Sequence, residues 1–143
     1  MTENTERFQK IAADGSVLPR DATDWEAVLD TKTGLMWDKE AVPVKNGKPA
    51  TVEKAATKSR AAGFDDWRAP TVDELFALAD RTRVSPAIDV EFFPDTPSDW
   101  FWSSTPYAGS PSGCAWLVFF DSGSSLWYFH KYSGFVRACR VGQ

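Results

Sequence analysis

One short segment, DWRAPTVDEL at residues 66–75, restricts the fold more than any other part of this chain. Pro70 disfavours helical backbone at Ala69, so the residues before it are extended and lead into a turn. Thr71 and Glu74 then have the spacing of a capping box, in which each side chain accepts a hydrogen bond from the other residue's backbone amide. We therefore predict a helix that begins at Thr71.

The residues after this start repeat with helical spacing, which predicts one buried face and one face toward water. Asp73, Glu74 and Asp80 fall on the solvent side. The apolar positions are Val72, Leu75, Phe76, Leu78 and Ala79.

Elsewhere the pattern predicts one more helix and several short strands. Thr51 is the expected N-cap of the first helix, and Gly63 its C-terminal cap. Prolines divide residues 84–97 into a structured loop. The predicted strands cover residues 7–18, 35–37, 101–104, 114–120, 125–130 and 135–141, with a turn at 14–15 in the first of them. We expect residues 1–6 to be a disordered tail and residues 7–143 to form a single α+β domain, with two helices early and one compact antiparallel sheet late.

Charge and hydropathy exclude some classes of protein. The net charge of -4 argues against nucleic-acid binding, which needs a basic surface. No run approaches the about 20 apolar residues of a membrane span, so we expect no membrane insertion. The N-terminus lacks the pattern of a signal peptide. We expect synthesis in the cytoplasm and leave the final site open between cell surface, virion and cytoplasm.

Residues 100–135 hold 12 of the chain's 20 aromatic residues, together with many serines and few charges. This composition is typical of β-strands with tight turns and also of adaptable binding surfaces. Because alternate strand residues face opposite ways, each face of the strand near residue 127 presents a ring beside a polar or cationic group. The sequence does not distinguish between two interpretations of this segment, a ligand-binding surface and an ordinary sheet surface. The candidate ligand-binding residues are Trp100, Phe101, Tyr107, Ser124, Ser125, Trp127, Tyr128, His130 and Tyr132.

Other prominent residues have structural interpretations. Asp66, Arg68 and Glu74 are grouped tightly enough to form a buried ion-pair network that fixes the turn. Large apolar side chains on predicted strands favour the core. The tryptophans expected there are Trp37, Trp67, Trp102 and Trp116.

The sequence gives little support for metal binding or catalysis. The carboxylates of Asp89, Glu91, Asp95 and Asp99 follow one loop and could hold a calcium ion, but a solvated acidic loop is favoured. His130 has no evident catalytic partner. We therefore expect no metal, no cofactor and no enzyme activity.

The two cysteines, Cys114 and Cys139, lie on predicted core strands. Buried free thiols are the default for such positions. A disulfide between them is the alternative in an oxidising compartment.

Four segments together resemble the domain-of-unknown-function 1566 family, best known from the C-terminal domain of a Legionella collagen-like adhesin. They are Thr-Gly-Leu-Met-Trp at 33–37, Gly-Phe-Asp-Asp-Trp-Arg-Ala-Pro-Thr-Val-Asp-Glu-Leu at 63–75 with Ala69 in the place of a leucine, Phe-Trp-Ser-Ser at 101–104, and the terminal element at 136–143 that contains Arg137. The resemblance implies a C-type-lectin-like fold in which two helices flank a small twisted antiparallel sheet. It also implies a display scaffold, with Arg137 as a structural residue.

Three functional hypotheses follow. The first is a non-catalytic module that binds a glycan or a protein, and the alternative is a phage- or mobile-element-encoded protein with one specific protein partner. An oxidase of the formylglycine-generating type, using Cys114 and Cys139, is the third and is disfavoured. A homo-oligomer is compatible with each. A sulfated glycan would require clustered cations. The only such group in this acidic chain is Lys45, Lys48, Lys54, Lys58 and Arg60.

Overall fold

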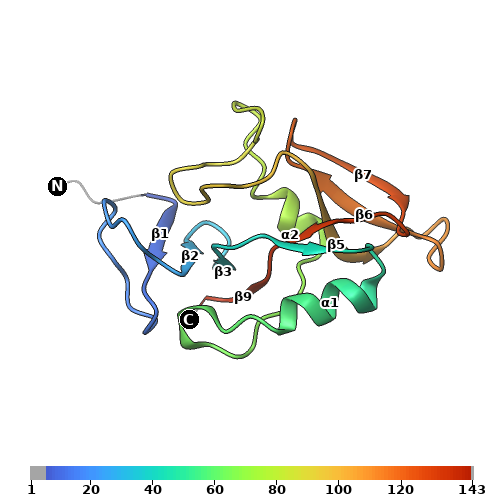
Figure 1. The fold of residues 1–143 in the computed structure, drawn as a ribbon. Helices are drawn as coiled ribbons and strands as arrows, with labels where there is room; N and C mark the ends of the chain where they lie inside the picture. The colour runs from blue at the N-terminus through green and yellow to red at the C-terminus, as the bar shows by residue number, and fades with distance from the viewer. Residues whose placement is uncertain (1–5, 143) are drawn as a thin grey trace.

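Two β-sheets lie side by side in the computed structural model, which describes residues 6–142 (Figure 1). The four-stranded sheet has the order β1-β2-β3-β9, and the five-stranded sheet has the order β4-β8-β5-β6-β7. The first contains β1 (Phe8–Ile11), β2 (Ala27–Asp30), β3 (Leu35–Asp38) and β9 (Cys139–Val141). The second contains β4 (Val42–Val44), β5 (Trp100–Pro106), β6 (Cys114–Phe119), β7 (Ser124–Phe129) and β8 (Gly134–Val136). With its helices, the chain is an α+β protein.

The helices α1 (Pro49–Thr57) and α2 (Val72–Phe76) cover opposite faces of the five-stranded sheet. Val52 of α1 belongs to the hydrophobic cluster that contains Trp102. Leu75 of α2 belongs to the other cluster, with Phe101. Because neighbouring residues on a strand point to opposite faces, Phe101 and Trp102 mark the α2 side and the α1 side of β5. The sheet is therefore buried from both sides along β5.

The predicted start of the second helix is confirmed. Thr71 is the N-cap of α2, its hydroxyl accepts from the Glu74 amide, and the Glu74 carboxylate accepts from the Thr71 amide. The first helix differs from the prediction, because Lys48 and not Thr51 is its N-cap and Pro49 occupies the first turn. Proline is well placed there, since the first-turn N–H has no partner within a helix.

The predicted end of that helix is also wrong. α1 stops at Thr57, and a separate 3-10 turn (η1, Ala61–Gly63) follows it. Gly63 closes this turn and not the helix, with a φ of 82° that glycine adopts without strain.

The predicted single late sheet is wrong, because the chain builds one sheet largely from its early strands. The last predicted strand, residues 135–141, divides into β8 and β9, which belong to different sheets. Arg137 and Ala138 lie between them, and both are buried. Strand β4, around Pro43, escaped prediction because proline argues against a strand. The predicted tail, residues 1–6, lies outside the described residues except for Glu6.

Trp102 lies at the centre of the α1 side and is held between two glycines. It is fully buried. A Cβ atom at Gly47 would lie 2.0 Å from the Trp102 ring, and one at Gly134 would lie 2.9 Å from its Cδ1 and Nε1 atoms. Trp37 and Trp67 are buried as well. In the described part of the chain, no helix is long and apolar enough to cross a membrane.

Candidate functional site

A hollow of about 320 Å³ opens between α2 and the outer strands of the five-stranded sheet. Trp116 of β6 and Ser125 of β7 line it on the sheet side. Val72, Asp73 and Phe76 line it on the helix side. We call this feature the α2 hollow.

Stacked aromatic rings border the α2 hollow. Trp127 faces Trp116 across the strand pair, and its ring lies parallel to that of Tyr107, with centroids 4.2 Å apart and an interplanar angle of 3°. The Tyr107 ring meets Trp116 edge-on at 6.0 Å. Gly109 packs against Tyr107 so closely that a Cβ there would lie 2.6 Å from the ring. These contacts hold the rings in place while 41% of Trp127 stays exposed to solvent.

Two polar side chains reach the same hollow without a partner. Asp73 lies in the first turn of α2, and Ser125 is exposed on β7. Within residues 6–142, neither the Asp73 carboxylate nor the Ser125 hydroxyl makes a hydrogen bond or an ion pair. The hollow thus combines an apolar floor with one carboxylate and one hydroxyl that are available to a ligand.

The opposite face of β7 carries a second group of rings, the Trp100 cluster. The centroid of Trp100 lies 5.1 Å from that of Tyr128 and 6.3 Å from that of Tyr132. His130 follows β7 and its Nε2 atom lies 3.1 Å from the Ser112 carbonyl oxygen, so that nitrogen is already engaged. This cluster faces the α1 side and does not border the α2 hollow.

The candidate residues from the sequence therefore separate into two surfaces. Tyr107, Ser125 and Trp127 come together at the α2 hollow, whereas Trp100, Tyr128 and Tyr132 form the Trp100 cluster. Ser124 is exposed in the turn, where its hydroxyl lies 2.9 Å from that of Ser122.

Two assignments are corrected. Phe101, expected on the surface, is fully buried under α2. Trp116, expected in the core, is only half-buried and lines the hollow. The reason is that β7 is the edge strand, so the short helix α2 leaves the outer part of this face open.

Besides Trp116, three residues of the hollow were missed as ligand-binding candidates: Val72, Asp73 and Phe76. The sequence placed them on the second helix and turned Asp73 toward water. The sequence does not show which strands pack beside that helix. Those strands decide whether Asp73 faces bulk solvent or a hollow.

The predicted network of Asp66, Arg68 and Glu74 is two separate ion pairs. Arg68 donates to both carboxylate oxygens of Glu74 at 2.9 Å. Asp66 instead accepts from Arg140 at 2.5 and 3.1 Å. These side chains are partly exposed, because the side chain of Arg68 is 37% and that of Asp66 59% accessible. The first pair fixes the start of α2, and the second ties β9 to the turn before it.

Arg137 is a buried cation between β8 and β9. Its guanidinium donates to the carbonyl oxygens of Asp38 and Lys39 and to the hydroxyl of Thr96. The Phe93 ring lies 4.8 Å from it. Burial lowers the pKa of Arg137 to about 10. The side chain therefore cross-links the ends of both sheets to the loop that precedes β5.

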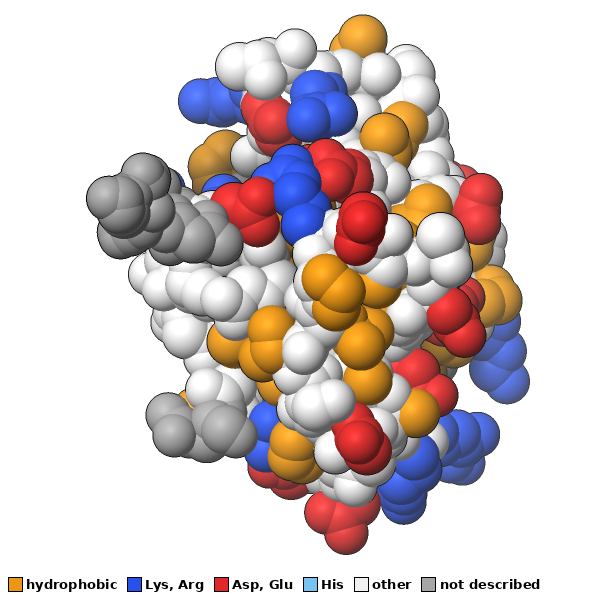
Figure 2. All heavy atoms as spheres, turned by 90° about the vertical axis from the view of Figure 1, so that its left-hand side faces the viewer, with side chains coloured by type: hydrophobic (Ala, Val, Ile, Leu, Met, Phe, Trp, Pro, Cys, Tyr) orange, Lys and Arg blue, Asp and Glu red, His pale blue; other side chains and the backbone are white. Residues whose placement is uncertain are grey.

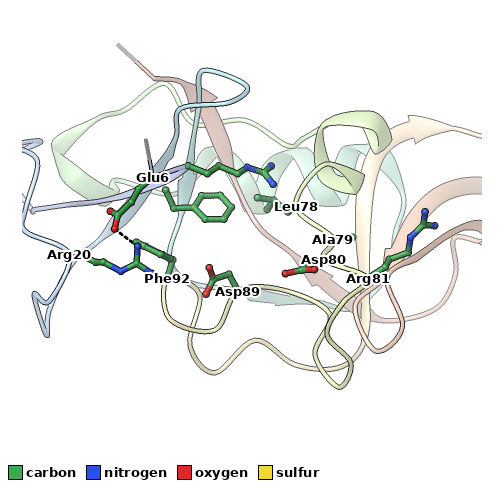
Figure 3. A pocket seen from close by; sticks show the side chains of 10 residues that line it. Glu6, Arg20, Leu78, Ala79, Asp80, Arg81, Asp89 and Phe92 are labelled. Carbon is green, nitrogen blue, oxygen red and sulfur yellow. Dashed lines mark hydrogen bonds and ion pairs between the residues drawn. The ribbon is translucent and has the colours of Figure 1, made fainter. Parts of the chain in front are cut away.

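A larger crevice of about 390 Å³ lies between the start of β1 and the loop after α2 (Figure 3). Arg20 binds Glu6 and Glu91 at its rim. Arg83 binds Asp80 at 3.0 Å and Asp89 at 3.6 Å. Basic and acidic side chains are likewise mixed in the upper part of the face in Figure 2. The carboxylates that line this crevice are therefore engaged by arginines, and we assign it no ligand.

Residues 6–142 form neither a cluster of metal ligands nor an exposed thiol. In the described residues, no group of three His, Cys, Asp or Glu side chains is placed to hold a metal ion. Asp89 and Glu91 of the acidic loop bind arginines instead. Cys114 and Cys139 are buried free thiols, and burial raises the pKa of Cys139 to about 12.

Comparison with known protein families identifies a match over most of the chain. The model of the Lcl C-terminal domain family matches residues 26–140. No curated protein matches the chain. The matched range includes all residues of the α2 hollow.

Proposed function

Because the chain belongs to the Lcl C-terminal domain family, an adhesin-like class of bacterial domain compatible with binding, we propose that it is a non-catalytic recognition module that holds a glycan in the α2 hollow. Its fold, in this proposal, is a variant of the C-type lectin fold. The finding that carries the proposal is the hollow itself, in which the Trp116 ring lies beside the unpartnered side chains of Asp73 and Ser125, with the stacked rings of Tyr107 and Trp127 at its border.

This combination suits a sugar. The face of a pyranose ring carries C–H groups, which pack on aromatic rings such as those of Trp116 and Trp127. Its hydroxyls can donate to a carboxylate and exchange hydrogen bonds with the hydroxyl of Ser125. A hollow of about 320 Å³ is within the usual range of small-ligand sites.

Charge favours a glycan without sulfate groups. The Asp73 carboxylate repels an anionic substituent in the hollow. Lys48 is the N-cap of α1, Lys54 lies in its last turn and Lys58 is its C-cap. These cations therefore lie on the α1 side of the five-stranded sheet, opposite the α2 hollow. A sulfated chain bound by them would not reach the stacked rings.

The burial of the thiols supports a non-catalytic role. Cys114 is 2% exposed and Cys139 is fully buried, so a peptide substrate cannot reach either sulfur in this structure. The raised pKa of Cys139 also keeps its thiol protonated near neutral pH.

A single protein partner is the second candidate, and exposed rings on β7 favour it. Phe129 is 52% exposed and Trp127 is 41% exposed. Large exposed aromatics of this kind are enriched at protein interfaces. A phage- or mobile-element-encoded binding protein would use the same surface.

Binding to an array of neutral, acidic and sulfated glycans tests the proposal. We expect retention of a neutral glycan that Trp127→Ala and Asp73→Asn each weaken by about tenfold or more, which is the loss expected for one stacking or charged hydrogen-bond contact. Tyr128→Ala is the matched control, because Tyr128 lies on the same strand but faces away from the hollow. No retention of any glycan, or equal losses in all three variants, would reject the proposal.

A further inference from the structure

The outer edge of β7 is open, in contrast to the other three sheet edges. Val17 forms an antiparallel bridge with Ile11 of β1, and Arg68 exchanges backbone hydrogen bonds with Cys139 of β9. On β4, Pro43 removes a backbone donor. Proteins usually cover or interrupt their edge strands, because an open edge pairs with other strands. In the described residues, neither a covering segment nor a proline protects β7.

The backbone of β7 is oriented for such pairing. The His130 amide donates to the Gly113 carbonyl oxygen, which sets the alternation of the ladder between β6 and β7. Residues 124, 126, 128 and 130 therefore direct their N–H and C=O groups toward β6. Ser125, Trp127 and Phe129 direct theirs away from the sheet.

The charges beside β7 are self-complementary. Residues 122–130 contain no Asp, Glu, Lys or Arg. Asp121 precedes the strand and Lys131 follows it. When two copies of β7 run antiparallel with Leu126 opposite Leu126, the turn with Asp121 of one copy and the turn with Lys131 of the other lie at the same end of the strand pair, so opposite charges are brought together there.

We propose that β7 pairs antiparallel with β7 of a second copy of this chain, with the two Leu126 residues facing each other. The two five-stranded sheets then form one continuous sheet. In this register Ser125 lies opposite the partner's Trp127 in a hydrogen-bonded pair, with both side chains on the α2 side. The partner's ring would then close the open side of the α2 hollow. The pairing itself does not depend on what the hollow binds.

The mass of the purified protein in solution tests the pairing without any ligand. We expect light scattering after gel filtration to give twice the 15.9 kDa of one chain, with dissociation on dilution. Ser125→Pro removes an outward N–H that no intramolecular ladder uses, and we expect it to weaken dimerisation by about tenfold or more. Ser125→Ala keeps that N–H and should dimerise normally. Circular dichroism checks that both variants are folded.

Cross-linking tests the register independently of Ser125→Pro. In the proposed pairing the Cα atoms of the two Leu126 residues are about 4.5 Å apart, within the range of a disulfide. Leu126→Cys should therefore form a covalent dimer under mild oxidation, which a non-reducing gel detects. Tyr128→Cys is the control, because Tyr128 lies opposite Ser124 of the other copy and not opposite itself.

Three results would overturn the proposal. The first is a monomer at every concentration. The second is a dimer that a folded Ser125→Pro variant leaves unchanged, and the third is a covalent dimer from Tyr128→Cys but not from Leu126→Cys. Loss of glycan binding with an intact dimer would reject the proposed function alone.

Discussion

Replacing Gly47 with alanine measures how rigidly Trp102 is held. A Cβ atom at this position would lie 2.0, 2.2 and 2.4 Å from three atoms of the Trp102 ring. Ordinary carbon contacts are about 3.5–4.0 Å, so the ring or the backbone must move by more than about 1 Å. Neither moves freely, because Gly134 borders the ring and the Gly47 amide donates to the His130 carbonyl oxygen at 2.8 Å.

We expect Gly47→Ala to lower the free energy of unfolding by about 3 kcal/mol, at the upper end for an overpacked core. The assay is urea denaturation followed by tryptophan fluorescence. With a slope of about 2 kcal/mol per molar urea, the midpoint should fall by about 1.5 M. Gly47 has no positive φ, so backbone strain does not contribute to this loss.

Two controls isolate the clash. Gly34 has a φ of +78° but no atom within 4 Å of an added Cβ, so Gly34→Ala reports strain alone and should cost about 1–2 kcal/mol. In a Trp102→Leu background, Gly47→Ala should cost far less than in the natural chain. Equal costs in the two backgrounds, within about 0.5 kcal/mol, would refute the reasoning.

Three further predictions concern buried or paired charges and thiols. Arg137→Lys should lower the free energy of unfolding by about 2–3 kcal/mol in the same assay, because lysine cannot reach the two carbonyls and Thr96 together; an unchanged midpoint would contradict this role. The hydrogen bonds from Arg68 hold the pKa of Glu74 below 4.5, so its stabilisation is complete above that pH and is lost as the pH falls through the lowered pKa. Glu74→Gln should therefore show a smaller loss of stability on acidification, and a slope as steep as that of the natural chain would argue against it. Cys114 and Cys139 should react with a thiol reagent at pH 8 only after unfolding, and rapid labelling of the native protein would contradict their burial.

Local features of the fold followed from the sequence where neighbouring residues decide the structure. The capping box at Thr71 depends on Glu74 three residues later, and it forms as predicted. The end of the first helix was missed because the cap at Gly63 belongs to a separate 3-10 turn after the helix has ended. Likewise, residues 135–141 have the composition of one strand, but β8 ends at Val136 and β9 begins at Cys139, with the buried Arg137 between them.

The candidate site was only partly predictable for a related reason. The aromatic and serine-rich segment pointed to Tyr107, Ser125 and Trp127, because this composition is typical of adaptable binding surfaces. Asp73 was not distinguished from other acidic residues on a solvated helix face. Its significance depends on the packing of α2 against the sheet, and that contact joins segments about 50 residues apart.

The position of β9 has a consequence for how the protein is made. β3 pairs with β9, although Leu35 and Val141 are roughly a hundred residues apart in sequence. Synthesis therefore delivers β1, β2 and β3 long before the strand that completes their sheet. Contacts of such long range slow folding, so these strands wait with an exposed edge while the rest of the domain is translated. A chain that stops before residue 139 lacks one strand of the four-stranded sheet, and ribosomal stalling in this region would yield a product for proteolysis.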